Sequence, residues 1–400
     1  MPAFFLPMDM KLHRYVYAAM DVLRDYSVDL PLQHHLRHFF RVNGKYGSRD
    51  RKWIRELCYA YFRTGERFSG LSLQERIMFS FFLVHQVNER FASEIVGPLP
   101  ISEPDFSQER SVKLKRLQEL TPILLTKDAF SFEGNFSASL NVEQWMQALN
   151  DQPEVWLRVN NGFYEKVFAA LTDASIPFIR HPELPLALSL PPGLAVDKTP
   201  VIGNGWAEVQ DLSSQKTLQG LEFAPHSEWL DACAASGGKS LLLLAMQANV
   251  HLTVSDNRAT MLENLQERFK RCGVKKYTAI VHDWTQGNPF DTDKKFDGIL
   301  ADVPCTGSGT WARSPEQMAV FSMDKLNAMV QLQRSILQSL LPLLKPGGRL
   351  IYITCSVFAA ENEDQREWLQ ENGLQLLDEQ LFQGSTENAD TLYRVVLQAM

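Results

Sequence analysis

Long apolar runs are missing from this sequence of 400 residues. No stretch approaches the roughly 20 consecutive apolar residues that a membrane-spanning helix needs. The opening MPAFFLPMDMKLHR has neither the basic start nor the long apolar centre of a signal peptide. We therefore expect a cytoplasmic protein without membrane contact. Low-complexity runs are also missing, and the composition of 45% hydrophobic and 22% charged residues is typical of a globular protein.

Cysteine is scarce, and no C-x-x-C pair occurs. An odd count in a chain without a secretion signal argues against a disulfide framework, and the missing pairs argue against a zinc cage. We therefore expect no metal site and regard catalysis as the most plausible role for a functional cysteine. The five cysteines are Cys58, Cys233, Cys272, Cys305 and Cys355.

A surplus of positive charge is also missing, because the net charge is −7. Taken alone, this balance argues against nucleic acid as a partner, since phosphate contacts need lysine and arginine. The distribution changes that conclusion: residues 1–67 contain 12 Lys+Arg against 7 Asp+Glu. Eight of these bases lie between Arg41 and Arg67, interleaved with aromatic residues. The segment forms either a solvated helix face or an RNA-contacting one.

At roughly 150 residues per domain, the length predicts two or three domains. Apolar residues recur at helical spacing from about residue 12 to 86 and again up to about 123, followed by a polar stretch to about 140. We predict a helical domain over residues 1–140. Residues 141–205 combine helical patterns at 142–149 and 163–174 with the strand-like VWLRVN at 155–160, and we predict a small α+β module there.

From residue 206 to 400 strand and helix patterns alternate, which predicts an α/β fold with a mostly parallel sheet covered by helices on both faces. Ligands bind such sheets at the carboxyl ends of the strands. Candidate strands end in Asp231–Cys233, Asp256, Asp283, Asp302–Cys305 and Cys355. The strands are expected at 228–233, 251–256, 278–283, 296–304 and 349–355, and the helices at 239–249, 259–272 and 324–345.

A loop of small residues follows the first of these strands and precedes a helix, where backbone can approach a ligand closely. Its residues are Cys233, Ala234, Ala235, Ser236, Gly237, Gly238 and Lys239. Gly238-Lys239-Ser240 resembles the end of a phosphate-binding G-x-x-x-x-G-K-[ST] loop. Cys233, however, occupies the position of the required first glycine, and its side chain would obstruct a tight wrap around a phosphate. This substitution argues against a nucleotide hydrolase.

The alternative is a nucleoside-binding loop with an acidic partner for the ribose hydroxyls. Asp256 lies 18 residues after Gly238, close to the spacing of about 20 expected for that partner. No G-x-G-x-x-G motif is present, so a smaller adenosine cofactor fits better than a dinucleotide. Asp283, at the end of the third strand, would then lie near the adenine, or it only caps the strand end.

Two cysteines lie beyond neighbouring strands: Cys305 in DVPCTGSG (302–309), and Cys355 in TCS (354–356), which ENE (361–363) follows. A buried cysteine is usually only a small apolar residue. A pair beside a cofactor loop indicates covalent catalysis, for which a thiolate must be formed. Such a thiolate can add to carbon 6 of a cytosine and make carbon 5 nucleophilic enough to attack a methyl-sulfonium.

These segments resemble ordered motifs of the RNA 5-methylcytosine methyltransferases, the RsmB/NOP/NSUN family. The matching stretches are VQDLSSQ (209–215), DACAASGGKS (231–240), DGILADVPCTGSGTW (297–311) and YITCSVFAAENE (352–363). The pairing of D-x-P-C with a later T-C-S is specific to this family, since DNA cytosine-5 methyltransferases use the Pro-Cys cysteine as nucleophile and lack the second one.

The resemblance implies a role for each matching residue. Cys355 would be the nucleophile, and Cys305 would assist breakdown of the covalent adduct. Residues Cys233 to Lys239 would line S-adenosyl-L-methionine, with Asp256 at the ribose and Asp283 near the adenine. Asp302 would sit between cofactor and target cytosine and help to protonate the base.

The resemblance extends beyond the catalytic half, because residues 153–160 are similar to the start of the family's small RNA-contacting subdomain, and residues 47–63 resemble its NusB-like helical extension. It implies a monomeric, Rossmann-like class I methyltransferase acting on RNA. Ribosomal RNA is the expected substrate; transfer RNA, or a non-catalytic role in assembly, are the alternatives. The sequence departs from the family at Ser236, where proline is common, and at 390–393, a poor match to its D-G-F-F strand.

Overall fold

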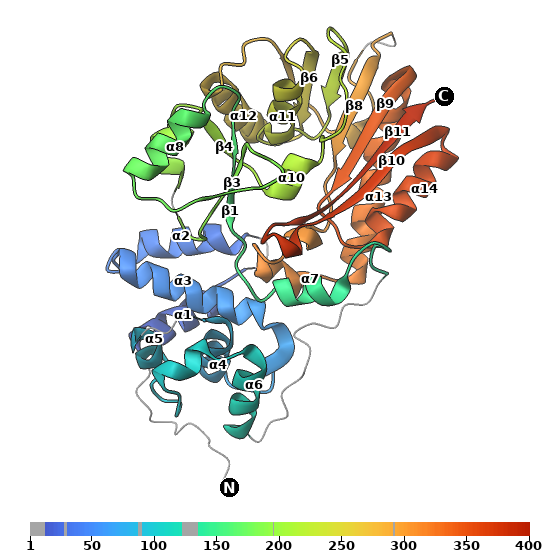
Figure 1. The fold of residues 1–400 in the computed structure, drawn as a ribbon. Helices are drawn as coiled ribbons and strands as arrows, with labels where there is room; N and C mark the ends of the chain where they lie inside the picture. Colours follow the sequence, from blue (N-terminus) through green and yellow to red (C-terminus); the bar gives the residue numbers. More distant parts are fainter. Residues whose placement is uncertain (1–12, 28–29, 87–89, 122–134, 195, 291–292) are drawn as a thin grey trace. The chain divides into compact units, whose positions relative to one another are not determined.

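The computed structural model describes residues 13–27, 30–86, 90–121, 135–194, 196–290 and 293–400. Its contacts divide the chain into two compact units (Figure 1). One unit contains residues 1–133, 149–151 and 311–321, and the other contains the remaining residues. Two segments with sequence predictions lie outside the described residues. They are the opening segment up to residue 12 and the part of the expected polar stretch up to residue 134. Among those described, no helix is at once long and apolar enough to cross a membrane.

The first unit is built from amphipathic helices, as the spacing of apolar residues predicts. Val16, Ile54, Leu57 and Ile77 are fully buried in its core. One helix starts at a capping box, in which Ser72 accepts from the backbone three residues later. The helices are α1 (Arg14–Arg24), α2 (Leu32–Val42), α3 (Ser48–Arg63), α4 (Leu73–Val84), α5 (Arg90–Ile95) and α6 (Arg110–Glu119).

Helix α3 carries much of the basic segment and separates its aromatic from most of its basic side chains. Trp53 is buried in the core, whereas Arg49 is exposed. Arg63 is an exception, because it is buried and donates to the carbonyl oxygens of Leu149 and Asp151 at 3.0 and 2.9 Å. Arg63 therefore ties α3 to residues 149–151 within this unit and does not belong to a solvated or RNA-contacting face.

The second unit begins with a small antiparallel sheet in the strand order β2-β3-β1-β4. The predicted strand at 155–160 is its β1, and the predicted helices around it are present. The elements are α7 (Val142–Ala148), β1 (Val155–Val159), α8 (Tyr164–Asp173), β2 (Ile179–Arg180), β3 (Ala187–Leu190), α9 (Pro200–Gly203) and β4 (Ala207–Val209), followed by α10 (Leu212–Lys216). This small module lies in the same compact unit as residues 206–310, and the domain boundaries expected from the sequence stay a prediction.

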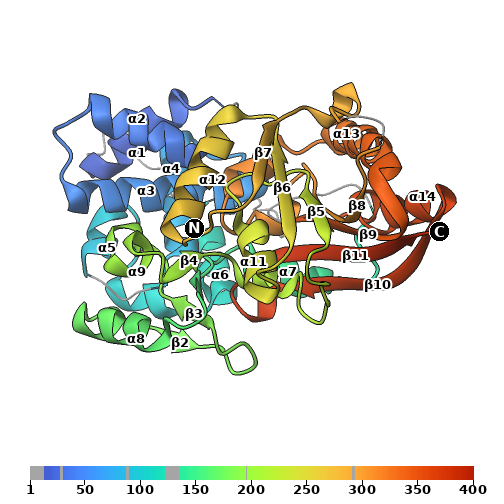
Figure 2. The same ribbon diagram turned by 90° about the horizontal axis from the view of Figure 1, so that it is seen from above.

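The larger sheet has the order β10-β11-β9-β8-β5-β6-β7 (Figures 1 and 2). From β9 to β7 neighbouring strands are parallel, which confirms the predicted α/β class, while β11 and β10 are antiparallel additions at one edge. The elements are β5 (Glu228–Asp231), α11 (Gly238–Met246), β6 (His251–Asp256), α12 (Ala259–Arg271), β7 (Thr278–Val281), β8 (Phe296–Asp302), α13 (Met323–Leu340), β9 (Leu344–Thr354), α14 (Glu363–Glu371), β10 (Leu374–Gln383) and β11 (Thr391–Ala399).

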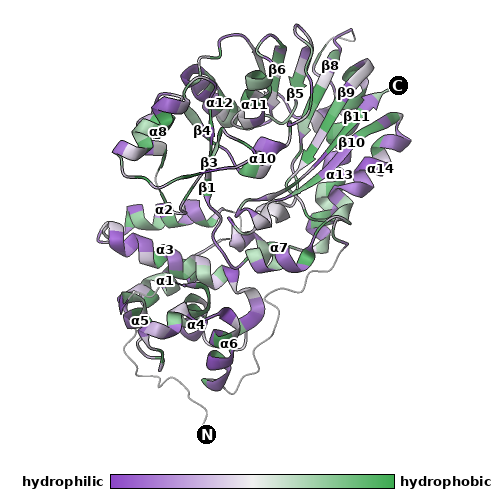
Figure 3. Cartoon of the chain, in the orientation of Figure 1, coloured by the Kyte–Doolittle hydropathy of each residue, from purple (hydrophilic) through white to green (hydrophobic). Residues whose placement is uncertain are grey.

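Successive residues of the central strands enter two different cores. Leu230 packs with α13 on one face of the sheet, and Trp229 packs with α11 and α12 on the other. This alternation follows from the two-residue period of a strand. The central strands are accordingly coloured as largely hydrophobic (Figure 3). Gly298 of β8 faces the Trp229 ring, where an added Cβ would lie only 2.3 Å from a ring carbon.

Candidate active site

The strand order places a switch point between β5 and β8. The chain passes from β5 outward to β6 and β7, then returns to β8 on the other side of β5. Crevices at such points, outside the carboxyl ends of the strands, are where open α/β sheets bind ligands. Asp231 ends β5 and Asp302 ends β8, so both carboxylates lie at this position.

The loop between β5 and α11 turns sharply on two residues in the left-handed conformation. Gly237 has φ +80°, and a Cβ there would lie 2.7 Å from the Phe269 ring. Ala235 adopts φ +46°, a conformation that costs energy for a residue with a side chain. Its backbone N–H donates to Asp256 Oδ2 at 3.0 Å, which helps to hold the turn. Small side chains thus leave the loop backbone accessible beside the crevice.

Asp231 is the most deeply buried carboxylate at the crevice. Its Oδ2 accepts a hydrogen bond from Ser240 Oγ at 2.5 Å, whereas its Oδ1 has no hydrogen-bond partner within the described part of the chain. Burial raises the pKa of Asp231 to about 7, although the hydrogen bond from Ser240 opposes this rise. An unpartnered buried acceptor of this kind is suited to a ligand with hydrogen-bond donors.

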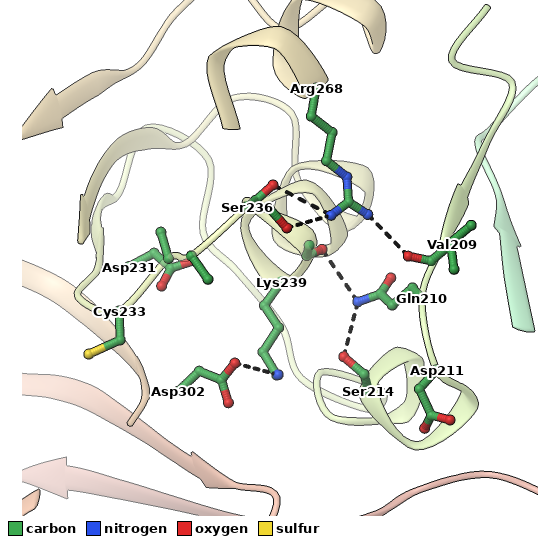
Figure 4. A pocket seen from close by; sticks show the side chains of 13 residues that line it. Val209, Gln210, Asp211, Ser214, Asp231, Cys233, Ser236, Lys239, Arg268 and Asp302 are labelled. Carbon is green, nitrogen blue, oxygen red and sulfur yellow. Dashed lines mark hydrogen bonds and ion pairs between the residues drawn. The ribbon is translucent and has the colours of Figure 1, made fainter. Parts of the chain in front are cut away.

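Lys239 and Asp302 form an ion pair across the crevice, with 2.6 Å between Nζ and Oδ2 (Figure 4). Burial acts to lower the pKa of Lys239, but the adjacent Asp302 carboxylate outweighs burial and holds that pKa above its ordinary value. The lysine therefore stays charged. A triphosphate would have to compete with Asp302 for this cation.

A cavity at the crevice is lined by most of the predicted loop and by residues that sequence reasoning did not single out (Figure 4). The predicted residues in its wall are Asp231, Cys233, Ala234, Ala235, Ser236, Gly238, Lys239 and Asp302. The others are Val209, Gln210, Asp211, Ser214 and Arg268. Residues 209–215 carry part of the family resemblance. That resemblance was the one indication in the sequence that this stretch lines the cavity.

Arg268 of α12 joins the small module to the loop. Its guanidinium is paired with Glu208, a fully buried carboxylate on β4. The same guanidinium donates to Ser236 Oγ at 3.1 Å and to the carbonyl oxygen of Ser236 at 3.4 Å (Figure 4). Because proline has no hydroxyl, the contact with Ser236 Oγ depends on the departure from the family pattern at this position.

Asp256 ends β6 and Asp283 lies two residues beyond the end of β7, and neither is among the residues that line the cavity. Asp256 accepts from Ala235 and from Arg258, whose Nε lies 2.9 Å from Oδ1. Burial acts to raise the pKa of Asp256, but these hydrogen bonds outweigh it and hold the pKa below its ordinary value. A ribose hydroxyl would have to share this carboxylate with Arg258. Asp283 accepts from the backbone N–H of Thr285 at 2.9 Å and therefore caps a short helix.

Cys305 and Cys355 follow β8 and β9, and their sulfur atoms are 3.3 Å apart. Both side chains are partly exposed, and neither cysteine is in a disulfide. The hydrogen bond between the sulfurs, together with burial, raises the pKa of Cys305 well above its ordinary value. Cys305 therefore remains a thiol at neutral pH and can donate its hydrogen to the Cys355 sulfur.

The E-N-E segment after Cys355 connects the two cysteine loops through hydrogen bonds. Glu361 is fully buried and accepts from the N–H of Thr306 at 2.8 Å and from its hydroxyl at 2.6 Å. Asn362 accepts from Thr354 Oγ1 at 2.6 Å and donates to the carbonyl oxygen of Ser356 at 2.9 Å. The residues on both sides of Cys355 are thus held by the motif that follows it.

The fold and the crevice define a Rossmann-like methyltransferase domain. A family described as 16S rRNA methyltransferase RsmB/F matches residues 218–395. The ribosomal RNA small subunit methyltransferase B of Salmonella newport (strain SL254) is 30% identical over 352 residues, covering 80% of this chain and 82% of the relative. The chain belongs to the RsmB/NOP/NSUN family of RNA methyltransferases.

Solved structures with similar folds support the architecture. The crystal structure of PH0851 has a TM-score of 0.70 at 21% identity and covers 97% of this chain and 99% of its own. NSun6 from Pyrococcus horikoshii, solved with SFG, has a TM-score of 0.58 at 18% identity and covers 64% of this chain and 93% of its own. At these identities the likeness concerns the fold alone.

Proposed function

We propose that this protein methylates carbon 5 of a cytosine in ribosomal RNA, with S-adenosyl-L-methionine as methyl donor and Cys355 as nucleophile. The observation that carries the proposal is the pair of sulfurs at 3.3 Å, on the loops that follow two adjacent parallel strands. Family membership and the ribosomal RNA enzymes among the relatives support the same substrate class.

The crevice suits S-adenosylmethionine better than a nucleoside triphosphate. Three acidic residues, Asp211, Asp231 and Asp302, line the cavity. Its two cations, Lys239 and Arg268, are each already paired with a carboxylate, which disfavours a triphosphate. The free Oδ1 of Asp231 offers an acceptor to a donor such as the methionine ammonium. We assign the loop Cys233–Lys239 to holding the cofactor, with Asp256 at the ribose and Asp283 toward the adenine. The bound cofactor supplies an electrophilic methyl group on a sulfonium sulfur.

The two cysteines divide the reaction between them. The Cys355 thiol loses its proton to solvent, and the Cys305 thiol, which keeps its own proton, donates a hydrogen bond to the resulting thiolate. This thiolate then attacks carbon 6 of the cytosine. Asp302, charge-paired with Lys239, is assigned to the edge of the base. There its carboxylate stabilises a ring that takes its proton from solvent, which makes carbon 6 a better electrophile. After carbon 5 is methylated, its proton must leave before the bond between Cys355 and carbon 6 can break. Cys305 assists this release.

The remaining parts of the chain are assigned to holding the RNA. The exposed Arg49 and Lys52 of α3, with the partly exposed Arg51 beside them, are suited to phosphate contacts in the helical domain (1–140). The small module (141–205) is assigned to RNA contact as well. Because the target base must leave its stack to reach the sulfurs, looped RNA should react faster than an uninterrupted helix.

Methyl transfer from radiolabelled S-adenosylmethionine to ribosomal and transfer RNA tests the proposal. We expect label in ribosomal RNA, recovered as 5-methylcytidine after nuclease digestion, and none with Cys355→Ala. Asp256→Ala should weaken cofactor binding in calorimetry. Label in transfer RNA alone would make transfer RNA the substrate. RNA binding in the absence of cofactor, without any methyl transfer, would favour a non-catalytic assembly factor.

A further inference from the structure

Helix α13 places a buried glutamine between the two cysteine loops. Gln333 has no solvent exposure and lies outside every segment that carries the family resemblance. Its side-chain amide uses both donors and both acceptor positions. Nε2 donates to the carbonyl oxygen of Pro304 and to Glu361 Oε1, each at 2.9 Å. Oε1 accepts from Gln365 Nε2 at 3.0 Å and lies 3.1 Å from the hydroxyl of Tyr352, whose one hydrogen it shares with the carbonyl oxygen of Glu361 at 2.7 Å.

These partners fix which way the amide points. A backbone carbonyl can only accept, so the contact with Pro304 requires the nitrogen of Gln333 on that side. The nitrogen then also meets the Glu361 carboxylate, and the oxygen meets the amide nitrogen of Gln365. No other assignment satisfies all four contacts, which makes this a fully satisfied buried polar network.

The partners on the nitrogen side belong to the backbone around Cys305. Pro304 directly precedes Cys305, and Thr306, which directly follows it, donates twice to Glu361. Gln333 and Glu361 together therefore hold the residues on either side of Cys305. On its oxygen side Gln333 meets Tyr352 of β9, the strand that leads into Cys355.

We propose that Gln333 is a positioning residue that sets the separation of the Cys305 and Cys355 sulfurs. It touches neither sulfur in any hydrogen bond and acts through the Pro304 carbonyl, Glu361 and Tyr352. The catalytic role of this positioning rests on the proposed function of the two cysteines. The separation of their sulfurs can be measured without catalysis.

The first measurement uses diamide, an azo compound that accepts two electrons and two protons while two thiols join as a disulfide. The rate at which Cys305 and Cys355 become linked, followed by peptide mass mapping, reports how often their sulfurs meet. Gln333→Met keeps the volume and removes all four hydrogen bonds. Displacing reacting groups by about 1 Å can cost about a hundredfold in rate, so we expect at least a tenfold slower linkage.

Two control variants separate positioning from general loss of packing. Gln365→Met removes one hydrogen bond from the same amide on the side away from Cys305, and Gln331→Met changes an exposed residue of the same helix. Gln331→Met should leave the rate unchanged, and Gln365→Met should change it far less than Gln333→Met at a similar loss of melting temperature. Gln333→Asn, which keeps the amide but withdraws it by one methylene, serves if Gln333→Met does not fold.

The second measurement is the methylation rate at saturating and limiting cofactor. Gln333→Met should lower kcat while KM for S-adenosylmethionine stays near the wild-type value, because the cavity wall does not include Gln333. Equal linkage rates in Gln333→Met and Gln365→Met, with Gln333→Asn also like wild type, would overturn the proposal. If the linkage rates separate as expected but no variant, nor the wild type, methylates RNA, the proposed function fails and the positioning role stands.

Discussion

Replacing Asp231 by asparagine should remove a pH-dependent cost of folding. In the unfolded chain an aspartate ionises near pH 4, whereas burial raises the pKa of Asp231 to about 7 in the folded protein. Below pH 4 both states are protonated and the group costs nothing. As the pH rises toward 7 only the unfolded chain loses the proton, so folding stability falls, and above pH 7 the loss is complete. At about 1.4 kcal/mol per pH unit, the upper bound is about 1.5 kcal/mol at pH 5 and about 4 kcal/mol at pH 8.

Hydrogen exchange of the β5 and α11 amides, followed by mass spectrometry, measures this effect in the second unit. The stability advantage of Asp231→Asn over wild type should grow by about 2–3 kcal/mol from pH 5 to pH 8. Asp297→Asn is a matched control, since the carboxylate of Asp297 is partly exposed, is paired with Lys345 and has a lowered pKa, so its contribution is constant over that range. A difference between Asp231→Asn and wild type that does not change with pH would refute the reasoning.

Further outcomes follow from the other charged groups. Arg268→Gln should weaken S-adenosylmethionine binding by about tenfold or more, because it releases the loop at Ser236. The control Arg271→Gln loses a contact with the same Glu208 but none with the loop, and it should leave cofactor binding unchanged. Equal affinities of the two variants in calorimetry would count against the role of Arg268. Reversing the charge of the α3 bases at positions 49, 51 and 52 together should weaken RNA binding and lower its salt slope by about one unit for each lost phosphate contact, without changing cofactor affinity; an unchanged binding curve across a salt series would make them a solvated face.

The parallel strands and the loop between them could be predicted because their signals are local. Apolar runs of four to seven residues, each followed by a small or acidic residue and then a helical pattern, recur along residues 228–354, and the structure has a strand at each. The antiparallel strands β10 and β11 were not predicted. In the edge strand β10 most side chains are exposed or partly so, and such a strand carries no apolar run to find. Strand β11 lies between β10 and β9 and is mostly buried, but no α-helix separates it from β10, so the alternation of strand and helix that indicates the parallel strands does not mark it.

The buried polar contacts of the site could not be predicted for a different reason. Gln333 and Arg268 lie in helices with several charged and amide residues, where a polar residue normally faces solvent. Only the tertiary structure places Gln333 against Pro304 and Glu361, and Arg268 against Ser236. The sequence likewise indicated an acidic residue at position 256 but not its engagement by Arg258.

Trapping of the covalent adduct tests the central claim most directly. Attack by Cys355 must precede methyl transfer, whereas Cys305 is assigned to the release that follows. Purified variants incubated with labelled ribosomal RNA and S-adenosylmethionine are separated on a denaturing gel, on which a covalent complex survives heating in detergent. We predict that Cys305→Ala accumulates the complex, and that Cys355→Ala and the double variant form none. A complex with Cys355→Ala, and none with Cys305→Ala, would contradict the account by making Cys305 the nucleophile.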